Sequence, residues 1–173
     1  MNFNLYISST DKISGTNNNG VYQVNFNDFL DHKYDKYKIN FTLNTVSSNY
    51  INSANNSYSS CSVNLNTNTR FYSFSTTTKS HASTIGFLTK SADSTFLYNK
   101  PMDNLDTIIQ RPSSNNLTLS FLNLENNTLL VATDASGNPL GDMSNFNALF
   151  TFIPMCFVVR PFDWYYTAHP QWH

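Results

Sequence analysis

The sequence predicts an all-β protein, a sandwich or barrel of short antiparallel strands with little helix. Three observations predict this fold class. Apolar and polar residues alternate with a period of two, clusters of turn residues separate the alternating segments, and no segment has the periodicity of a long helix. Alternation with this period places one face of each strand in a core and the other face in water.

The alternation is clearest in residues 37–44, where every odd position is apolar and every even position is polar. This is typical of a half-buried strand. The same pattern occurs in residues 3–7, 22–26, 61–65 and 117–121. Weaker strand patterns occur in residues 70–74, 96–98, 107–110, 128–132, 149–153 and 156–159.

Turn residues fall between the strand patterns, in residues 14–20, 52–57, 112–116 and 134–139. Segments 27–34 and 80–90 are each predicted to hold at most a short helical turn, because both are rich in β-branched or turn residues.

The length of 173 residues favours one domain with one core. Aromatic residues make up 15% of the chain, with 14 Phe and 10 Tyr, so the core is predicted to be aromatic. No internal repeat, charge block or linker marks a second domain. We expect a single domain over residues 1–160 and an aromatic C-terminal tail over residues 161–173.

Charged residues make up only 12% of the chain and the formal net charge is -1. Lys and Arg do not cluster, so the sequence predicts no direct binding to nucleic acid or to an anionic membrane. Asn, Ser and Thr supply the polar surface instead. Two explanations remain open: an AT-rich genome fills tolerant loops with Asn, or many faces are dry contacts where a charge is costly to desolvate.

The beginning of the chain has no basic segment followed by an apolar stretch, and no apolar run approaches the roughly 20 residues of a membrane helix. We therefore expect no transmembrane segment and a protein made in the cytoplasm. Cys61 and Cys156 lie in alternating apolar contexts far apart in the sequence, which favours buried free thiols over a disulfide.

The sequence predicts no enzyme, because it has no nucleophile elbow, zinc-protease motif, phosphate loop or Cys-x-x-Cys. His169 and His173 have the spacing of metal ligands on one helix face, but Pro170 argues against a helix there. The segment from Asp134 to Asp142 slightly resembles a calcium loop with an incomplete set of ligands, so a hairpin turn is predicted. We predict no catalytic residue, no cofactor and no metal site.

The tail over residues 161–173 contains both tryptophans of the chain and has neither helix nor strand periodicity. Trp and Tyr often anchor protein interfaces. Two hypotheses remain: the tail wraps back and closes one end of the core, or it docks into a neighbouring subunit.

The segment Asn4–Ser9, with residues 15–18 and 22–26, resembles the first hairpin of small jelly-roll capsid proteins of large eukaryotic double-stranded DNA viruses. Residues 110–121, with 134–140 and 142–143, are similar to the late strands of minor capsid or penton proteins in that group.

This resemblance implies a single eight-stranded antiparallel jelly-roll sandwich. It also implies a structural virion protein, a penton or cement-type minor capsid building block that sits in the capsid. Its partners would be copies of itself and other capsid proteins, the major capsid protein among them. The alternative is a carbohydrate- or receptor-binding module, because lectins share this architecture. The loops and the tail supply the candidates for subunit contacts, namely Trp164, Tyr165, Tyr166, Trp172, Asn17, Asn18 and Tyr58.

Overall fold

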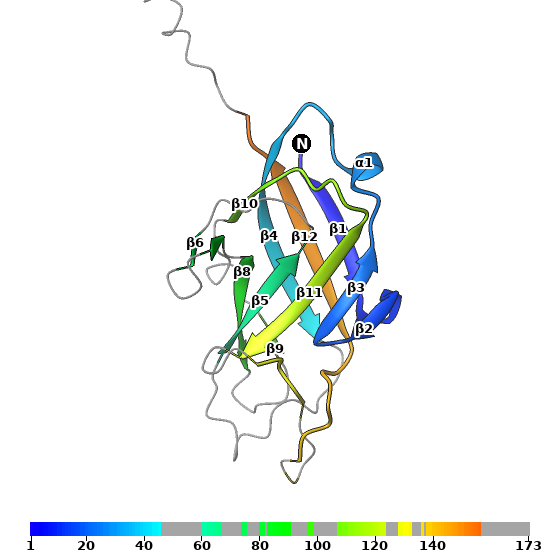
Figure 1. Ribbon diagram of the computed structural model, residues 1–173, viewed down its shortest axis with the longest axis vertical. Helices are drawn as coiled ribbons and strands as arrows, with labels where there is room; N and C mark the ends of the chain where they lie inside the picture. The colour runs from blue at the N-terminus through cyan, green and yellow to red at the C-terminus, as the bar shows by residue number, and fades with distance from the viewer. Residues whose placement is uncertain are drawn as a thin grey trace, which may run out of the picture.

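The computed structural model describes residues 1–45, 60–66, 74–75, 80–81, 83–90, 97–98, 107–123, 128–132, 136 and 138–156. These residues form an all-β structure in which two antiparallel sheets are packed in layers, with β11 crossing in front of β12 in Figure 1. The fold class predicted from the alternating pattern is therefore confirmed.

Sheet A has four strands. Their order is β1 (Phe3–Ser8), β12 (Phe146–Pro154), β4 (Lys36–Thr45) and β10 (Thr107–Gln110). At the centre of β12, Phe150 lies opposite Leu5 of β1 on one side and Phe41 of β4 on the other. The last described strand thus joins two strands from the beginning of the chain.

Sheet B has six strands. Their order is β2 (Ser14–Thr16), β3 (Asn19–Gln23), β11 (Asn116–Asn123), β5 (Ser60–Asn66), β8 (Thr84–Lys90) and β9 (Leu97–Tyr98). A register shift between Val63 and Asn64 interrupts the pairing of β5 with β8. The remaining elements are the short pair β6 (Phe74–Ser75) and β7 (Ser80–His81), the 3-10 turn η1 (Ser9–Asp11) and the helix α1 (Phe26–Phe29).

The core lies between the sheets because alternate residues of each strand point inward. Phe121 of β11 meets Phe146 of β12 edge to face, with ring centroids 5.0 Å apart, and this contact joins the two sheets. Edge-to-face pairs of this kind add to the stabilisation from burial alone. Other fully buried large side chains include Tyr37, Phe26, Phe41, Phe150, Phe152, Ile39, Leu65, Ile85 and Leu88.

Aromatic residues of α1 cover one end of this core. Phe26 and Phe29 approach Phe152 with ring centroids 6.0 and 5.6 Å apart, and Phe3 approaches both Phe29 and Tyr37 at 6.1 Å. These rings bury the start of β1 and the last part of β12. The predicted aromatic core is therefore confirmed.

Several element predictions need correction. Residues 80–90 were expected to hold at most a short helical turn, and they contain β7 and β8, with Ile85 and Leu88 of β8 buried in the core. The strand expected at 22–26 ends at Gln23, and α1 begins at Phe26. Residues 128–132 make only an isolated bridge, between Leu129 and Leu122.

Two predictions near the described C-terminal end also change. The strand expected at 149–153 already begins at Phe146, because the alternation of buried and outward residues extends back to that position. Cys156 is a free thiol as predicted, but it is exposed, because it follows the end of β12. The side chain of Cys61 and residues 157–159 lie outside the part of the chain that the structure describes.

Replacing Gly15 by Ala should destabilise the fold more than replacing Gly141 by Ala. Both glycines have a left-handed backbone, with φ of 83° and 81°. A Cβ at Gly15 would lie 2.2 Å from the carbonyl oxygen of Asn19, whereas a Cβ at Gly141 would meet nothing within 4 Å. In G141A we expect the free energy of unfolding to fall by about 1 kcal/mol, from the backbone strain alone. In G15A we expect it to fall by about 2–4 kcal/mol, because the clash adds to the strain. Equal losses in chemical denaturation would contradict this account of Gly15.

Candidate functional site

Asn17 and Asn18 are the two turn residues of the hairpin formed by β2 and β3, since Thr16 pairs with Asn19. The side chains of both are buried, with 8% and 2% of their surface exposed. Asn is one of the residue types that short hairpin turns favour. The buried side-chain amides of Asn17 and Asn18 require hydrogen-bond partners, because a buried polar group without a partner lowers the stability of the fold.

The carboxylate of Asp142 binds this turn from the other end of the sequence. Its Oδ2 accepts a hydrogen bond from the backbone N–H of Asn17 at 2.9 Å, and its Oδ1 accepts one from the N–H of Asn18 at 2.9 Å. Oδ1 also accepts from the N–H of Met143 at 2.7 Å. Because the acceptor is charged, these bonds are stronger than ordinary amide–carbonyl bonds.

The two asparagine amides extend the contact in both directions. Asn17 Nδ2 donates to the carbonyl oxygen of Met143 at 2.8 Å, and Asn18 Nδ2 donates to the carbonyl oxygen of Leu130 at 2.7 Å. Lys12 Nζ donates to Asn17 Oδ1 at 2.8 Å. We call Lys12, Asn17, Asn18 and Asp142 the Asp142 network. It joins the hairpin to the loop before β12.

The position of the Asp142 network decides how the predicted residues act. Asn17 and Asn18 were candidates for subunit contacts. In the structure their side chains form hydrogen bonds within the chain and stabilise the hairpin. The segment that ends at Asp142 was predicted to form a hairpin turn; Asp142 accepts from the neighbouring Met143, but its other partners lie about 125 residues away. Nothing local in the sequence indicates that long-range contact.

Tyr22 lies beside the Asp142 network on β3. Its side chain is 2% exposed, and its hydroxyl has no hydrogen-bond partner among the described residues. Burial raises the pKa of Tyr22 to about 12, with further contributions from the negative charges of Asp11 and Asp142. The neutral phenol is therefore strongly favoured at this position.

Replacing Asp142 by Asn should lower the free energy of unfolding by about 1–3 kcal/mol. An amide retains one acceptor oxygen but turns an NH₂ group toward a backbone N–H. The matched control is Asp28→Asn, because Asp28 is exposed and its carboxylate accepts from Asn25 Nδ2 in a surface contact within the described part of the chain. We expect the control to stay within about 0.5 kcal/mol of the original protein. Denaturation curves that coincide for the two variants would contradict the proposed role of Asp142.

The raised pKa of Tyr22 predicts a loss of stability at high pH. The Tyr22 hydroxyl loses its proton near pH 10.0 in the unfolded chain and near pH 12 in the folded chain. The stability that depends on the protonated hydroxyl is therefore fully present below pH 10 and is lost between these two values. Tyr22→Phe removes this dependence. Between about pH 9 and 11.5 the free energy of unfolding of the original protein should fall by on the order of 2 kcal/mol more than that of the variant. Parallel pH profiles of unfolding free energy would show that the assignment to Tyr22 is wrong.

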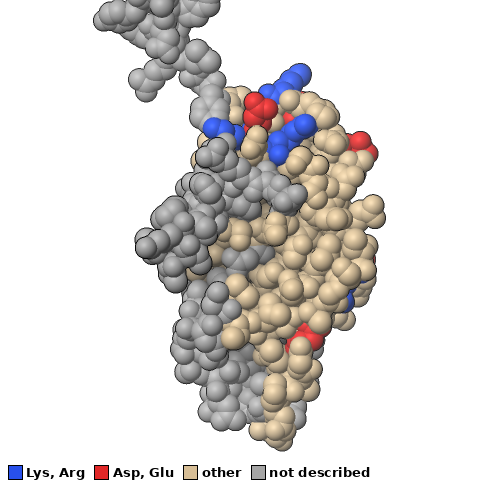
Figure 2. Space-filling model, in the orientation of Figure 1, with Lys and Arg blue, Asp and Glu red and all other residues tan. Residues whose placement is uncertain are grey.

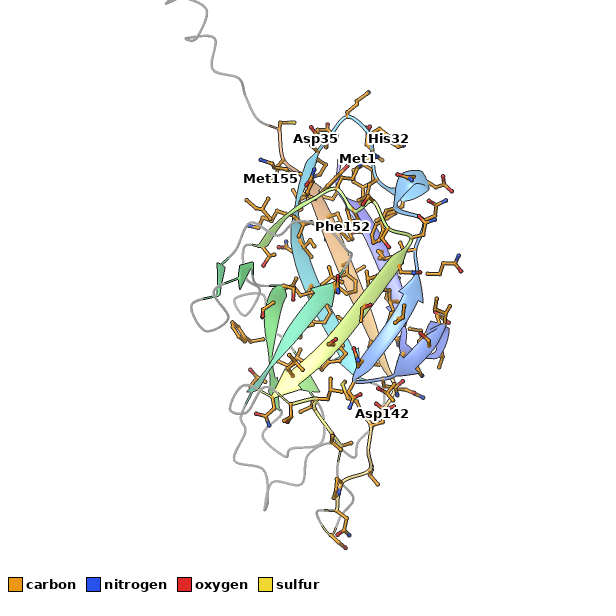
Figure 3. The ribbon with its side chains drawn as sticks, in the orientation of Figure 1. Met1, His32, Asp35, Asp142, Phe152 and Met155 are labelled. Carbon is orange, nitrogen blue, oxygen red and sulfur yellow. The ribbon has the colours of Figure 1, made fainter. Side chains whose placement is uncertain are left out.

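Charged side chains gather at the two ends of the sandwich. Figure 2 shows Lys, Arg and Asp concentrated at the upper end, and Figure 3 places His32, Asp35 and Met155 there, opposite Asp142. Arg111 contacts two residues at this upper end. Its backbone N–H donates to the carbonyl oxygen of Asp35 at 2.7 Å, and its guanidinium contacts His32 Nδ1. The end that α1 covers therefore carries most of the described charge.

The outward residues of β3 and β11 on sheet B are uncharged, and Lys36 and Lys38 are the outward charges of β4 on sheet A. On sheet B, Ser120 Oγ donates to Asn19 Oδ1 at 2.8 Å, and on sheet A, Thr151 Oγ1 donates to Asn4 Oδ1 at 3.0 Å. Such cross-strand pairs satisfy polar groups within the chain. The outward residues of β3 and β11 are Asn19, Val21, Gln23, Asn116, Thr118, Ser120 and Leu122.

The aromatic candidates for subunit contacts lie outside the described residues. This applies to Tyr58 and to the whole tail, including Trp164, Tyr165, Tyr166 and Trp172. At the last described position, the Cys156 sulfur approaches Tyr34 and is the main cause of the raised pKa of that tyrosine. The contact roles of the tail residues stay predictions.

Within the described ranges, no three His, Cys, Asp or Glu side chains come together in a way that would hold a metal ion. Nor does any helix in that part of the chain have the length and apolar character needed to cross a membrane. Comparison with known proteins finds no match among protein-family models, curated proteins or solved structures.

Proposed function

We propose that the chain is a structural virion protein, a penton or cement-type minor capsid building block with a single eight-stranded jelly-roll fold. The order in which the strands pair is the observation that carries this proposal. The first strand pairs with the last, β1 with β12, and the next pairs follow inward as β3 with β11, β4 with β10 and β5 with β8.

These pairings describe a chain folded back on itself once along its length. If the successive pairs of eight strands alternate between two sheets, the sheets have the orders 1-8-3-6 and 2-7-4-5, which is the arrangement of a jelly roll. Sheet A has the order β1-β12-β4-β10, and sheet B contains the order β3-β11-β5-β8. The short strands β2 and β9 then extend the two edges of sheet B.

The surface supports an assembly function for this fold. Because one fold hosts many functions, the argument for a capsid role also needs a surface suited to subunit contacts. Uncharged polar and apolar side chains cover most of the face of sheet B that Figure 2 shows, and the outward charges of β4 on sheet A are Lys36 and Lys38, so burying these faces against a neighbour desolvates few charges. Copies of the same chain and other capsid proteins, including the major capsid protein, are the partners that such surfaces fit.

Light scattering of the full chain and of a chain without residues 161–173 tests this function. We expect the full chain to form a closed ring or a set of oligomers, and the loss of both tryptophans to weaken that association. The control is circular dichroism of both chains, which should show the same strand content. A monomer whose mass does not change on truncation would instead favour the carbohydrate- or receptor-binding module.

A further inference from the structure

The first strand, β1, is an open edge of sheet A. Among the described residues it pairs only with β12, so one side of its backbone has no strand partner. An open edge is a template for another extended strand, because its free N–H and C=O groups alternate along it. Many proteins protect such edges with charges, proline, bulges or very short strands.

The other edges of the two sheets carry these protections and β1 does not. The strand β10 has four residues and is followed directly by Arg111 and Pro112. The strand β2 has three residues and contains the left-handed Gly15, and β9 has only two residues. In contrast, β1 has six residues with no charge, no proline and continuous register against β12.

The side chains beside this edge are also suited to a contact. Tyr6 points outward with 66% of its surface exposed, and it lies opposite Leu149 of β12, which is partly exposed on the same face. Asn4 is already bonded to Thr151 within the sheet. Among the described residues, the edge therefore offers backbone groups without a strand partner and a large exposed ring, with no charge to desolvate.

We infer that β1 pairs antiparallel with β1 of a second copy of this chain across a two-fold axis, which extends sheet A from four strands to eight. An antiparallel two-fold pair brings the same uncharged edge to both sides, so each backbone donor meets an acceptor and no like charges meet. This inference rests on the proposed assembly function and specifies one of its contacts.

The alternation of side chains restricts the register of this pair. Cross-strand partners must share a face, so outward residues pair with outward residues and inward residues with inward ones. With the axis at Leu5, Tyr6 lies opposite Asn4 of the other copy, and with the axis at Tyr6, the two tyrosines lie opposite one another. In both registers the two copies of residue 6 are neighbours, at most about 8 Å apart.

The test compares the full chain with Tyr6→Lys and with a matched control, Leu140→Lys. Leu140 is also an exposed apolar residue, 56% accessible, but it lies in the loop before Gly141. Tyr6→Lys puts two ammonium groups side by side at the two-fold axis, so we expect it to weaken dimerisation by about tenfold or more. Leu140→Lys should leave the dimer unchanged. Sedimentation velocity over a range of concentrations measures both effects.

Amide hydrogen exchange supplies a second measurement on the unmodified chain. If β1 pairs as inferred, the exchange of residues 3–8 slows as the concentration rises and the dimer forms. A chain that associates equally well with Tyr6→Lys, with no added protection of residues 3–8, overturns the β1 pairing but leaves the assembly function standing. A chain that remains monomeric at every concentration, with or without its tail, contradicts both.

Discussion

The position of β12 between β1 and β4 is the constraint on which sheet A depends. Without β12, the two strands from the first part of the chain have no partner in common. Bringing residues 146–154 back to residues 3–8 closes a very long loop, and the cost of that closure must be offset by what the strand buries. Its inward side chains Phe146, Ala148, Phe150 and Phe152 lie at the centre of the core. The Asp142 network stands immediately before this strand and ties its start to the first hairpin.

The Asp142 network also explains part of the unusual composition. Asn17 and Asn18 are buried and bonded by both backbone and side chain, and Asn19 and Asn4 satisfy hydroxyl groups of neighbouring strands. These asparagines stabilise the sandwich while leaving its faces nearly uncharged, which suits the proposed assembly through dry contacts. A genome bias toward Asn and a structural use of Asn therefore do not exclude one another.

Sequence reasoning predicted the strands best where alternation was strict, as in residues 37–44 and 117–121, because a period of two fits only a strand with one buried face. It left residues 80–90 ambiguous, with at most a short helical turn, whereas the structure has the strand β8 there with Ile85 and Leu88 buried. It selected Asn17 and Asn18 as candidates for subunit contacts, whereas the structure buries them against Asp142, whose distance in sequence no local pattern reveals.

The sequence by itself determined that this protein is all-β, that its core is aromatic, and that its surface carries few charges. These properties follow from composition and from the local period of apolar residues, which act within a few positions of one another. Only the tertiary structure decided which strands are neighbours, that Asp142 binds the turn at Asn17 and Asn18, and that β1 has an open edge. Pairing and burial depend on residues that are far apart in the chain, and the free energy that selects among them arises only when the two sheets pack together.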